Sequence, residues 1–256
     1  MSTNHVDRRA RGRGWAISAA LGAAVVTAVW VAGAMAATGP TSIDVPARAE
    51  QQAERGARVV LRPPAPAVAR YRVRLVQEWS AATHPTTLPP GWHTSPAVLT
   101  AHARSADVFA VGRLATAGIE SMAERGGTAL LRSELGSNAN VGDVDTGSGI
   151  NRSGVDSLEV TVTQSTGRLS LVTMLAPSPD WFVGFSGVPV FAGGVWADRI
   201  VLDMNPYDAG TDSGARFSSG DIDTQPRQSV SAPRDAQYVA AAGEGRFGYV
   251  VIERIG

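Results

Sequence analysis

The segment LEVTVT, residues 158–163, alternates apolar and polar residues without interruption. Successive side chains of an extended chain point to opposite faces, so Leu158, Val160 and Val162 share one face and Glu159 lies on the other. The segment therefore predicts a β-strand that buries one face and exposes the other.

Four other segments have similar strand character. They are YRVRLVQEW (71–79), LSLVTMLA (169–176), DRIVLDM (198–204) and RFGYVVIERI (246–255). Loops rich in Gly, Pro and Asn separate them, and no strand-helix-strand unit recurs along the chain. These features predict a mostly β fold, an antiparallel β-sandwich, rather than a parallel sheet covered by helices.

A small helical insertion is expected between the first strand and the central ones. Ser95-Pro96 predicts a helix start, because Ser caps free amides and Pro suits the first helical position. The segment LATAGIESMAER (114–125) predicts a helix that Gly126-Gly127 ends, and TALLRSEL (128–135) predicts a second helix. Residues 136–156 are rich in Gly, Asn, Asp and Ser, which predicts a mobile loop.

The first 70 residues are expected to lie outside this fold. Residues 1–14 form an Arg-rich n-region, and the uncharged residues 15–37 form an export segment that contains the cleavage pattern Ala34-Met35-Ala36. That segment is also long enough to span a bilayer, so a cleaved signal peptide and an uncleaved membrane anchor helix both remain open. Residues 38–70 predict a Pro- and Ala-rich spacer, and 71–256 one domain. Both alternatives place that domain outside the cell or at its surface.

Composition excludes several kinds of site. The chain has 23 basic and 23 acidic residues, so no net charge attracts nucleic acid, and we expect no nucleic-acid partner. It has no cysteine, which excludes disulfides, thiol nucleophiles and thiolate metal sites. A metal ion would have to bind oxygen or imidazole ligands.

Acidic residues follow two of the expected strands. Asp180 comes just after LSLVTMLA, Asp208 and Asp212 come just after DRIVLDM, and Glu159 lies on the polar face of its strand. If these strands are neighbours, four carboxylates meet at one edge, where their mutual repulsion favours a bound cation. Hard oxygen ligands in tight turns suit Ca²⁺. The residues leave a second interpretation open, in which the Asp side chains accept backbone amides and stabilise turns.

Three segments resemble the spondin N-terminal domain family. They are APSPDWFVGFSG (176–187), NPYDAGTDSGARFSS (205–219) and VVIERI (250–255). The chain is similar to that family over residues 71–255, and its export segment is of bacterial type. The resemblance implies an antiparallel β-sandwich similar to C2 domains, a Ca²⁺ ion at one edge, and a role in adhesion or binding outside the cell.

The resemblance also implies roles for individual residues. It assigns calcium ligation to Glu159, Asp180 and Asp208, with Asp212 either a further ligand or a loop-stabilising acceptor. It implies no enzymatic activity and a partner that is an extracellular or cell-surface protein or glycan. Two alternatives use the same acidic edge: a glycan hydrolase with paired carboxylates, and a C2-like module that docks on membranes with calcium.

Overall fold

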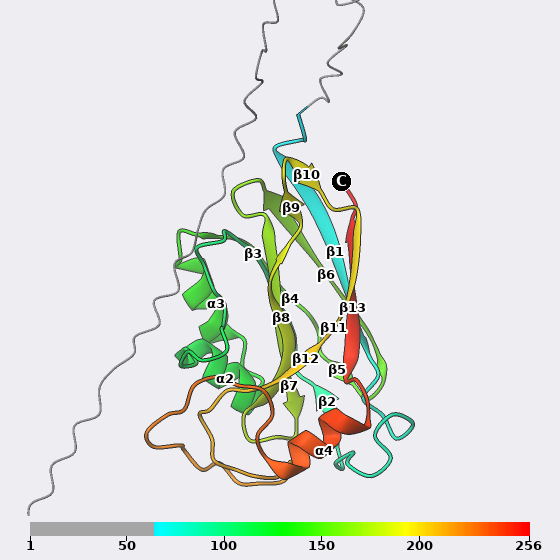
Figure 1. Cartoon of the computed structure of the whole chain (residues 1–256), viewed down its shortest axis with the longest axis vertical. Helices are drawn as coiled ribbons and strands as arrows, with labels where there is room; N and C mark the ends of the chain where they lie inside the picture. Colours follow the sequence, from blue (N-terminus) through cyan, green and yellow to red (C-terminus); the bar gives the residue numbers. More distant parts are fainter. Residues whose placement is uncertain (1–63) are drawn as a thin grey trace, which may run out of the picture. The chain divides into compact units, whose positions relative to one another are not determined.

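The computed structural model describes residues 64–256, which fold around two β-sheets (Figure 1). The expectations for residues 1–14 and 15–37, and for most of the spacer 38–70, lie outside the described residues. Across the described part of the chain, no helix is both long and apolar enough to cross a membrane.

The described chain is mostly β, with short helices. Its strands are β1 (Val68–Gln77), β2 (His93–Thr94), β3 (Val98–His102), β4 (Val141–Thr146), β5 (Ile150–Asn151), β6 (Gly154–Thr163), β7 (Arg168–Ala176), β8 (Trp181–Pro189), β9 (Phe191–Ala192), β10 (Val195–Trp196), β11 (Arg199–Asp203), β12 (Asn205–Asp208) and β13 (Gly248–Arg254). Its helices are α2 (Ala117–Arg125), α3 (Ala129–Gly136) and α4 (Ala236–Glu244).

Two antiparallel sheets contain most of the strands. Sheet I has the order β11-β13-β1-β6. Sheet II has the order β12-β8-β7-β2-β5, with β3 joined to β7 and β4 joined to β3. Strand pairs are antiparallel in both sheets. The prediction of a mostly β, antiparallel fold is therefore confirmed.

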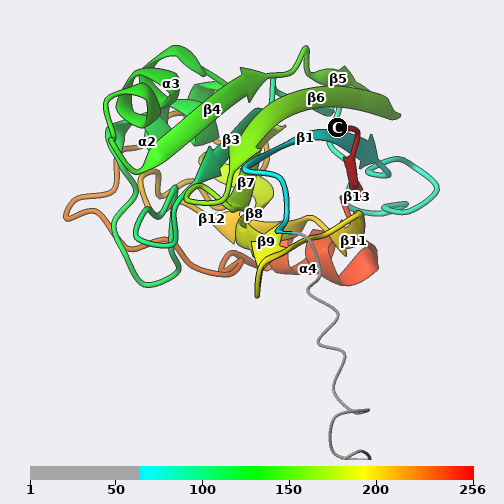
Figure 2. The same cartoon turned by 90° about the horizontal axis from the view of Figure 1, so that it is seen from above.

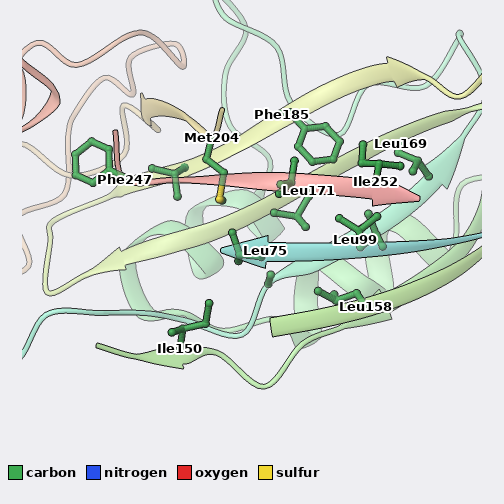
Figure 3. Packing of buried hydrophobic residues seen from close by; sticks show 14 of the residues in the cluster. Leu75, Leu99, Ile150, Leu158, Leu169, Leu171, Phe185, Met204, Phe247 and Ile252 are labelled. Atoms are coloured by element: carbon green, nitrogen blue, oxygen red, sulfur yellow. The ribbon is translucent and has the colours of Figure 1, made fainter. Parts of the chain in front are cut away.

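The inner faces of the two sheets share one hydrophobic core. Figure 3 shows Leu75, Leu158 and Ile252 of sheet I gathered with Leu171 and Phe185 of sheet II. Each of these side chains is 2% exposed or less, and burying one such side chain contributes about 1.5–3 kcal/mol. The alternation in LEVTVT and YRVRLVQ predicted the buried faces of β6 and β1 correctly.

Helices α2 and α3 cover the outer face of sheet II. Ile119 and Met122 of α2 and Leu131 of α3 join a second buried cluster with Val172 of β7 and Phe182 of β8. Figures 1 and 2 show both helices on the side of the molecule away from β11 and β13. The two outer faces of the fold are therefore covered differently.

The ends of α2 follow from its sequence. Thr116 is the N-cap, and its hydroxyl accepts the N–H of Ile119 at 3.2 Å. Gly126 ends the helix with a φ of +66°, a left-handed conformation that glycine adopts readily. The predicted stop at Gly126-Gly127 is confirmed.

The prediction that a helix starts at Ser95-Pro96 is wrong. The segment instead leads into β3, because Ser95 binds to the sheet: its Oγ accepts the N–H of Met174 at 3.0 Å, and its carbonyl accepts the Thr173 hydroxyl at 2.7 Å. A serine that is a good helix cap in isolation is held here by sheet contacts.

The prediction that residues 136–156 form a loop is also wrong. That segment contains β4, β5 and the start of β6, and β4 pairs with β3. Asp143 and Asp145 of β4 accept the backbone N–H groups of Thr161 and Glu159 on β6, each at 2.8 Å. Polar residues therefore form a strand here because their side chains bond the neighbouring edge.

Candidate metal centre

Asp180 and Asp208 lie next to each other where β8 begins and β12 ends. Asp208 is paired in register with Trp181, the residue after Asp180. The N–H of Ala209 donates to the backbone carbonyl of Asp180 at 3.2 Å. Strand pairing thus brings together two acids from separate sequence motifs.

Asp180 is fully buried, with 0% of its surface exposed. Its Oδ2 accepts the N–H groups of Thr211 and Asp212 at 2.8 and 3.2 Å, and the Thr211 hydroxyl donates to the same oxygen at 3.4 Å. Its Oδ1 has no hydrogen-bond partner within residues 64–256. Burial, followed by the nearby Asp208 carboxylate, raises the pKa of Asp180 to about 6. A cation would satisfy the free oxygen and offset both effects.

Asp208 is anchored in the turn that follows it. Its Oδ1 accepts the N–H of Gly210 at 2.9 Å and lies 3.5 Å from a guanidinium nitrogen of Arg234. Burial raises the pKa of Asp208, and the Arg234 charge opposes that shift. Gly210 has a φ of +74°, and a Cβ atom there would lie 2.5 Å from the carbonyl oxygen of Gln228. The turn therefore needs glycine for two reasons.

Asp212 stabilises its own loop. Its Oδ1 accepts the N–H of Gly214 at 2.6 Å, and its Oδ2 accepts the N–H of Ile222 at 3.0 Å. Each carboxylate oxygen has a second lone pair, so these bonds leave Asp212 able to contact an ion as well.

Glu159 lies apart from the three aspartates. It is on the outer face of β6, where its Oε1 accepts a hydrogen bond from Arg72 at 2.7 Å and its Oε2 accepts one from Arg70 at 2.7 Å. The hydrogen bond from Arg72 is the main cause of the lowered pKa of this carboxyl. The expected meeting of all four acids is therefore not seen, because β6 belongs to sheet I whereas β8 and β12 belong to sheet II.

The three aspartates fit a calcium ion in part. Within the described residues, no three acidic or histidine side chains are close enough to hold a metal ion by themselves. Asp180 and Asp208 supply buried carboxylate oxygens, and an ion there would take further ligands from Asp212 and from loop carbonyls. Oxygen donors of this kind suit Ca²⁺ better than Zn²⁺, which prefers thiolate and imidazole.

Glu124 of α2 has a buried side chain beside the loop that contains Asp212. The sequence did not predict it as a site residue. Its side chain is 5% exposed, and its Oε1 has no partner among the described residues. Burial raises the pKa of Glu124, and the Thr211 hydroxyl opposes that shift. Glu124 and Asp212 line one cavity of about 180 Å³. A glutamate in the last turn of a helix gives no sequence signal of burial, which here comes from packing.

Comparison with known proteins identifies the family. Residues 69–240 match the family model Spondin_N. The chain is 31% identical to spondin-2 of Rattus norvegicus over 172 residues, which covers 64% of this chain and 52% of that protein. Spondin-2 of Homo sapiens is 31% identical over 173 residues, with the same coverage of 64% and 52%.

A second relative is matched over a smaller part of its length. Spondin-1 of Gallus gallus is 28% identical over 204 residues, which covers 73% of this chain and 25% of that protein. The chain thus spans about half the length of these spondin-2 proteins and a quarter of this spondin-1. Because the family model matches most of the chain, the protein belongs to the spondin N-terminal domain family.

Proposed function

We propose that this chain is an exported, calcium-binding module for adhesion or binding outside the cell, without enzymatic activity. Family membership supports the binding role and the extracellular location. One observation supports calcium above the others: the fully buried Asp180 has a carboxylate oxygen beside Asp208 that no residue in the described part of the chain pairs with. The ligands we propose are Asp180, Asp208 and Asp212, and the geometry gives no support for Glu159.

Calcium would act in this module by holding loops in place. Asp180 precedes β8, whereas Asp208 and Asp212 flank the turn at Gly210, so one ion would tie two separate segments of sheet II together. Neutralising two buried carboxylates removes their repulsion. We propose that the loops fixed in this way present the surface that an extracellular or cell-surface protein or glycan contacts, on a sandwich similar to C2 domains.

A thermal unfolding experiment on the full chain tests this proposal. Melts with chelator, with Ca²⁺ and with Mg²⁺ compare the natural chain with Asp208→Asn and with Asp107→Asn, an exposed aspartate as matched control. Ca²⁺ at about 100 times its Kd should stabilise the natural chain and the control by about 2.7 kcal/mol, and Asp208→Asn should lose that gain. No calcium-dependent shift in the natural chain would refute the calcium site.

The glycan hydrolase alternative has one feature in its favour. A pKa of about 6 for Asp180 is in the range of a general acid. However, a side chain with no exposed surface cannot reach a glycosidic oxygen in the folded state. The membrane-docking alternative is tested by sedimentation with anionic vesicles, where calcium-dependent binding would favour it over the protein or glycan partner.

A further inference from the structure

The outer face of sheet I carries a line of arginines. Among the described residues no helix covers this face, whereas α2 and α3 cover the outer face of sheet II (Figures 1 and 2). Along β1, Arg70, Arg72 and Arg74 point outward between buried neighbours, and their side chains are 60%, 46% and 45% exposed. Outward residues on a strand repeat every ~6.6 Å, so these three arginines form a straight row about 13 Å long. We call them the arginine row.

Two glutamates neutralise the arginine row only in part. Glu159 of β6 accepts hydrogen bonds from Arg70 and Arg72. Glu253 of β13 lies 3.1 Å from Arg74 and 3.2 Å from Arg199 of β11, which is itself 58% exposed. Two carboxylates thus serve four guanidinium groups, which leaves an excess of positive charge. Ion pairs this exposed are weak, so an anionic ligand can replace the glutamates as partners of the arginines at a small cost in free energy.

Neighbouring residues define the direction in which a ligand would lie. Asp143 and Asp145 of β4 border sheet I beyond β6, where they bond the N–H groups of the β6 edge. A ligand crossing the strands would meet these acids, whereas one running along β1 would meet the arginine row. Val155 and Val201 are exposed valines on this face, and Tyr249 of β13 lies there partly buried, with the Arg246 guanidinium 4.8 Å from the centre of its ring. Among the described residues, this face therefore offers no freely exposed aromatic side chain to anchor a protein interface.

We propose that the arginine row binds a linear acidic polysaccharide, with sulfate or carboxylate groups along an extended chain, and that this binding needs no calcium. Guanidinium groups pair with such anions through two parallel hydrogen bonds. A polymer with repeated charges engages several arginines at once without a hydrophobic anchor. This role goes beyond the calcium-dependent function, since it uses sheet I and none of the three aspartates.

Binding of the full chain to immobilised heparin, a densely sulfated probe, tests the proposal. The triple variant Arg70→Gln, Arg72→Gln, Arg74→Gln is compared with Arg104→Gln, Arg113→Gln, Arg132→Gln, which removes the same charge from exposed arginines elsewhere. We expect the row variant to lose at least tenfold in affinity, and the control less than about threefold. Affinity of the natural chain should fall with rising salt, and the row variant should show a shallower dependence.

Glu159→Gln gives a test in the opposite direction. Removing this carboxylate frees Arg70 and Arg72, so heparin affinity should rise severalfold while the calcium-dependent melt stays unchanged. This variant keeps the row intact and remains informative even if the triple variant fails to fold.

Several results would overturn the proposal. Equal losses of heparin affinity in the row variant and its control would mean that binding depends on the total positive charge of the chain and not on the arginine row. Tighter binding to polyglutamate than to heparin would assign the row to an acidic peptide, and binding to neutral dextran would remove the role of charge. Loss of heparin binding in chelator would show that binding needs calcium, and would place the heparin site at the aspartate loops instead. The calcium melt is measured separately, so failure here leaves the proposed calcium function untouched.

Discussion

The aspartate loops and the outer face of sheet I are two charged regions of one domain with opposite surroundings. Asp180 is fully buried next to a second carboxylate; one of its oxygens accepts backbone amides, and the other has no partner among residues 64–256. Glu159 stands on an open sheet face, with both oxygens paired to arginines. Water screens the second region and is excluded from the first. A carboxylate therefore contributes strongly to the free energy of unfolding at the aspartate loops and weakly on the outer face of sheet I.

The largest effect is expected from Asp180→Ala. The substitution leaves the buried N–H groups of Thr211 and Asp212 without their acceptor, and each lost bond of this kind costs about 1–3 kcal/mol. We expect urea unfolding in chelator to show a loss of about 2–5 kcal/mol. Asp180→Asn keeps one acceptor oxygen and should lose clearly less. Equal losses in the two variants would mean that the amide bonds of Asp180 do not hold the loop.

The pH dependence of stability gives the next largest effect. Because the folded-state pKa of Asp180, about 6, exceeds its unfolded value of about 3.8, the folded state binds more protons between these values. In chelator the contribution of Asp180 is therefore complete below about pH 4 and is lost as pH rises to about 6, a change of about 3 kcal/mol. Burial raises the pKa of Asp208 too, which acts in the same direction.

Unfolding in urea from pH 4 to pH 7 measures this change. The difference between the natural chain and Asp180→Asn isolates the Asp180 contribution, since the other titrating groups are common to both. Saturating Ca²⁺ should remove most of the decline, because the ion favours the ionised carboxylate. A flat difference curve in chelator would contradict the raised pKa.

Sequence reasoning was reliable where local patterns decide the structure. The period of two in β1 and β6 gave the buried faces, and the Gly126 stop gave the end of α2. It failed for β4, whose Gly- and Asp-rich sequence is typical of a loop and which forms a strand through pairing with β3. Long-range pairing of that kind has no local signal.

The candidate site divides in the same way. The motifs around Asp180 and Asp208 predicted acids close together, but through neighbouring strands LSLVTMLA and DRIVLDM, which are β7 and β11 and belong to different sheets; the two acids are close because β12 pairs with β8. The alternation of residues predicted which face of β6 bears Glu159. It could not predict that β6 belongs to sheet I, whereas the aspartates lie at the strands of sheet II. Glu124 was not predicted, because its burial depends on how α2 packs.

Gly210→Ala should have an intermediate effect. A methyl group there meets the Gln228 carbonyl and also strains a backbone with a φ of +74°, which together cost about 2–3 kcal/mol. Gly193→Ala is the matched control, since Gly193 has a φ of +58° and no atom of the described residues lies within 4 Å of its Cβ position; it should cost about 1 kcal/mol. Urea unfolding compares the two. Similar losses would mean that the close approach to Gln228 relaxes freely.

The smallest effect on stability is expected from Glu159→Gln. Its carboxylate is exposed and its two arginines remain solvated when it is removed, so the unfolding midpoint should stay within experimental error at moderate salt. The calcium-dependent shift should also be unchanged, because sheet I separates Glu159 from the aspartates. Asp208→Asn, an identical change of chemical group, should abolish that shift. If Glu159→Gln also weakened calcium binding, the two regions would be coupled, and exposure alone would no longer explain why equal charges differ in effect.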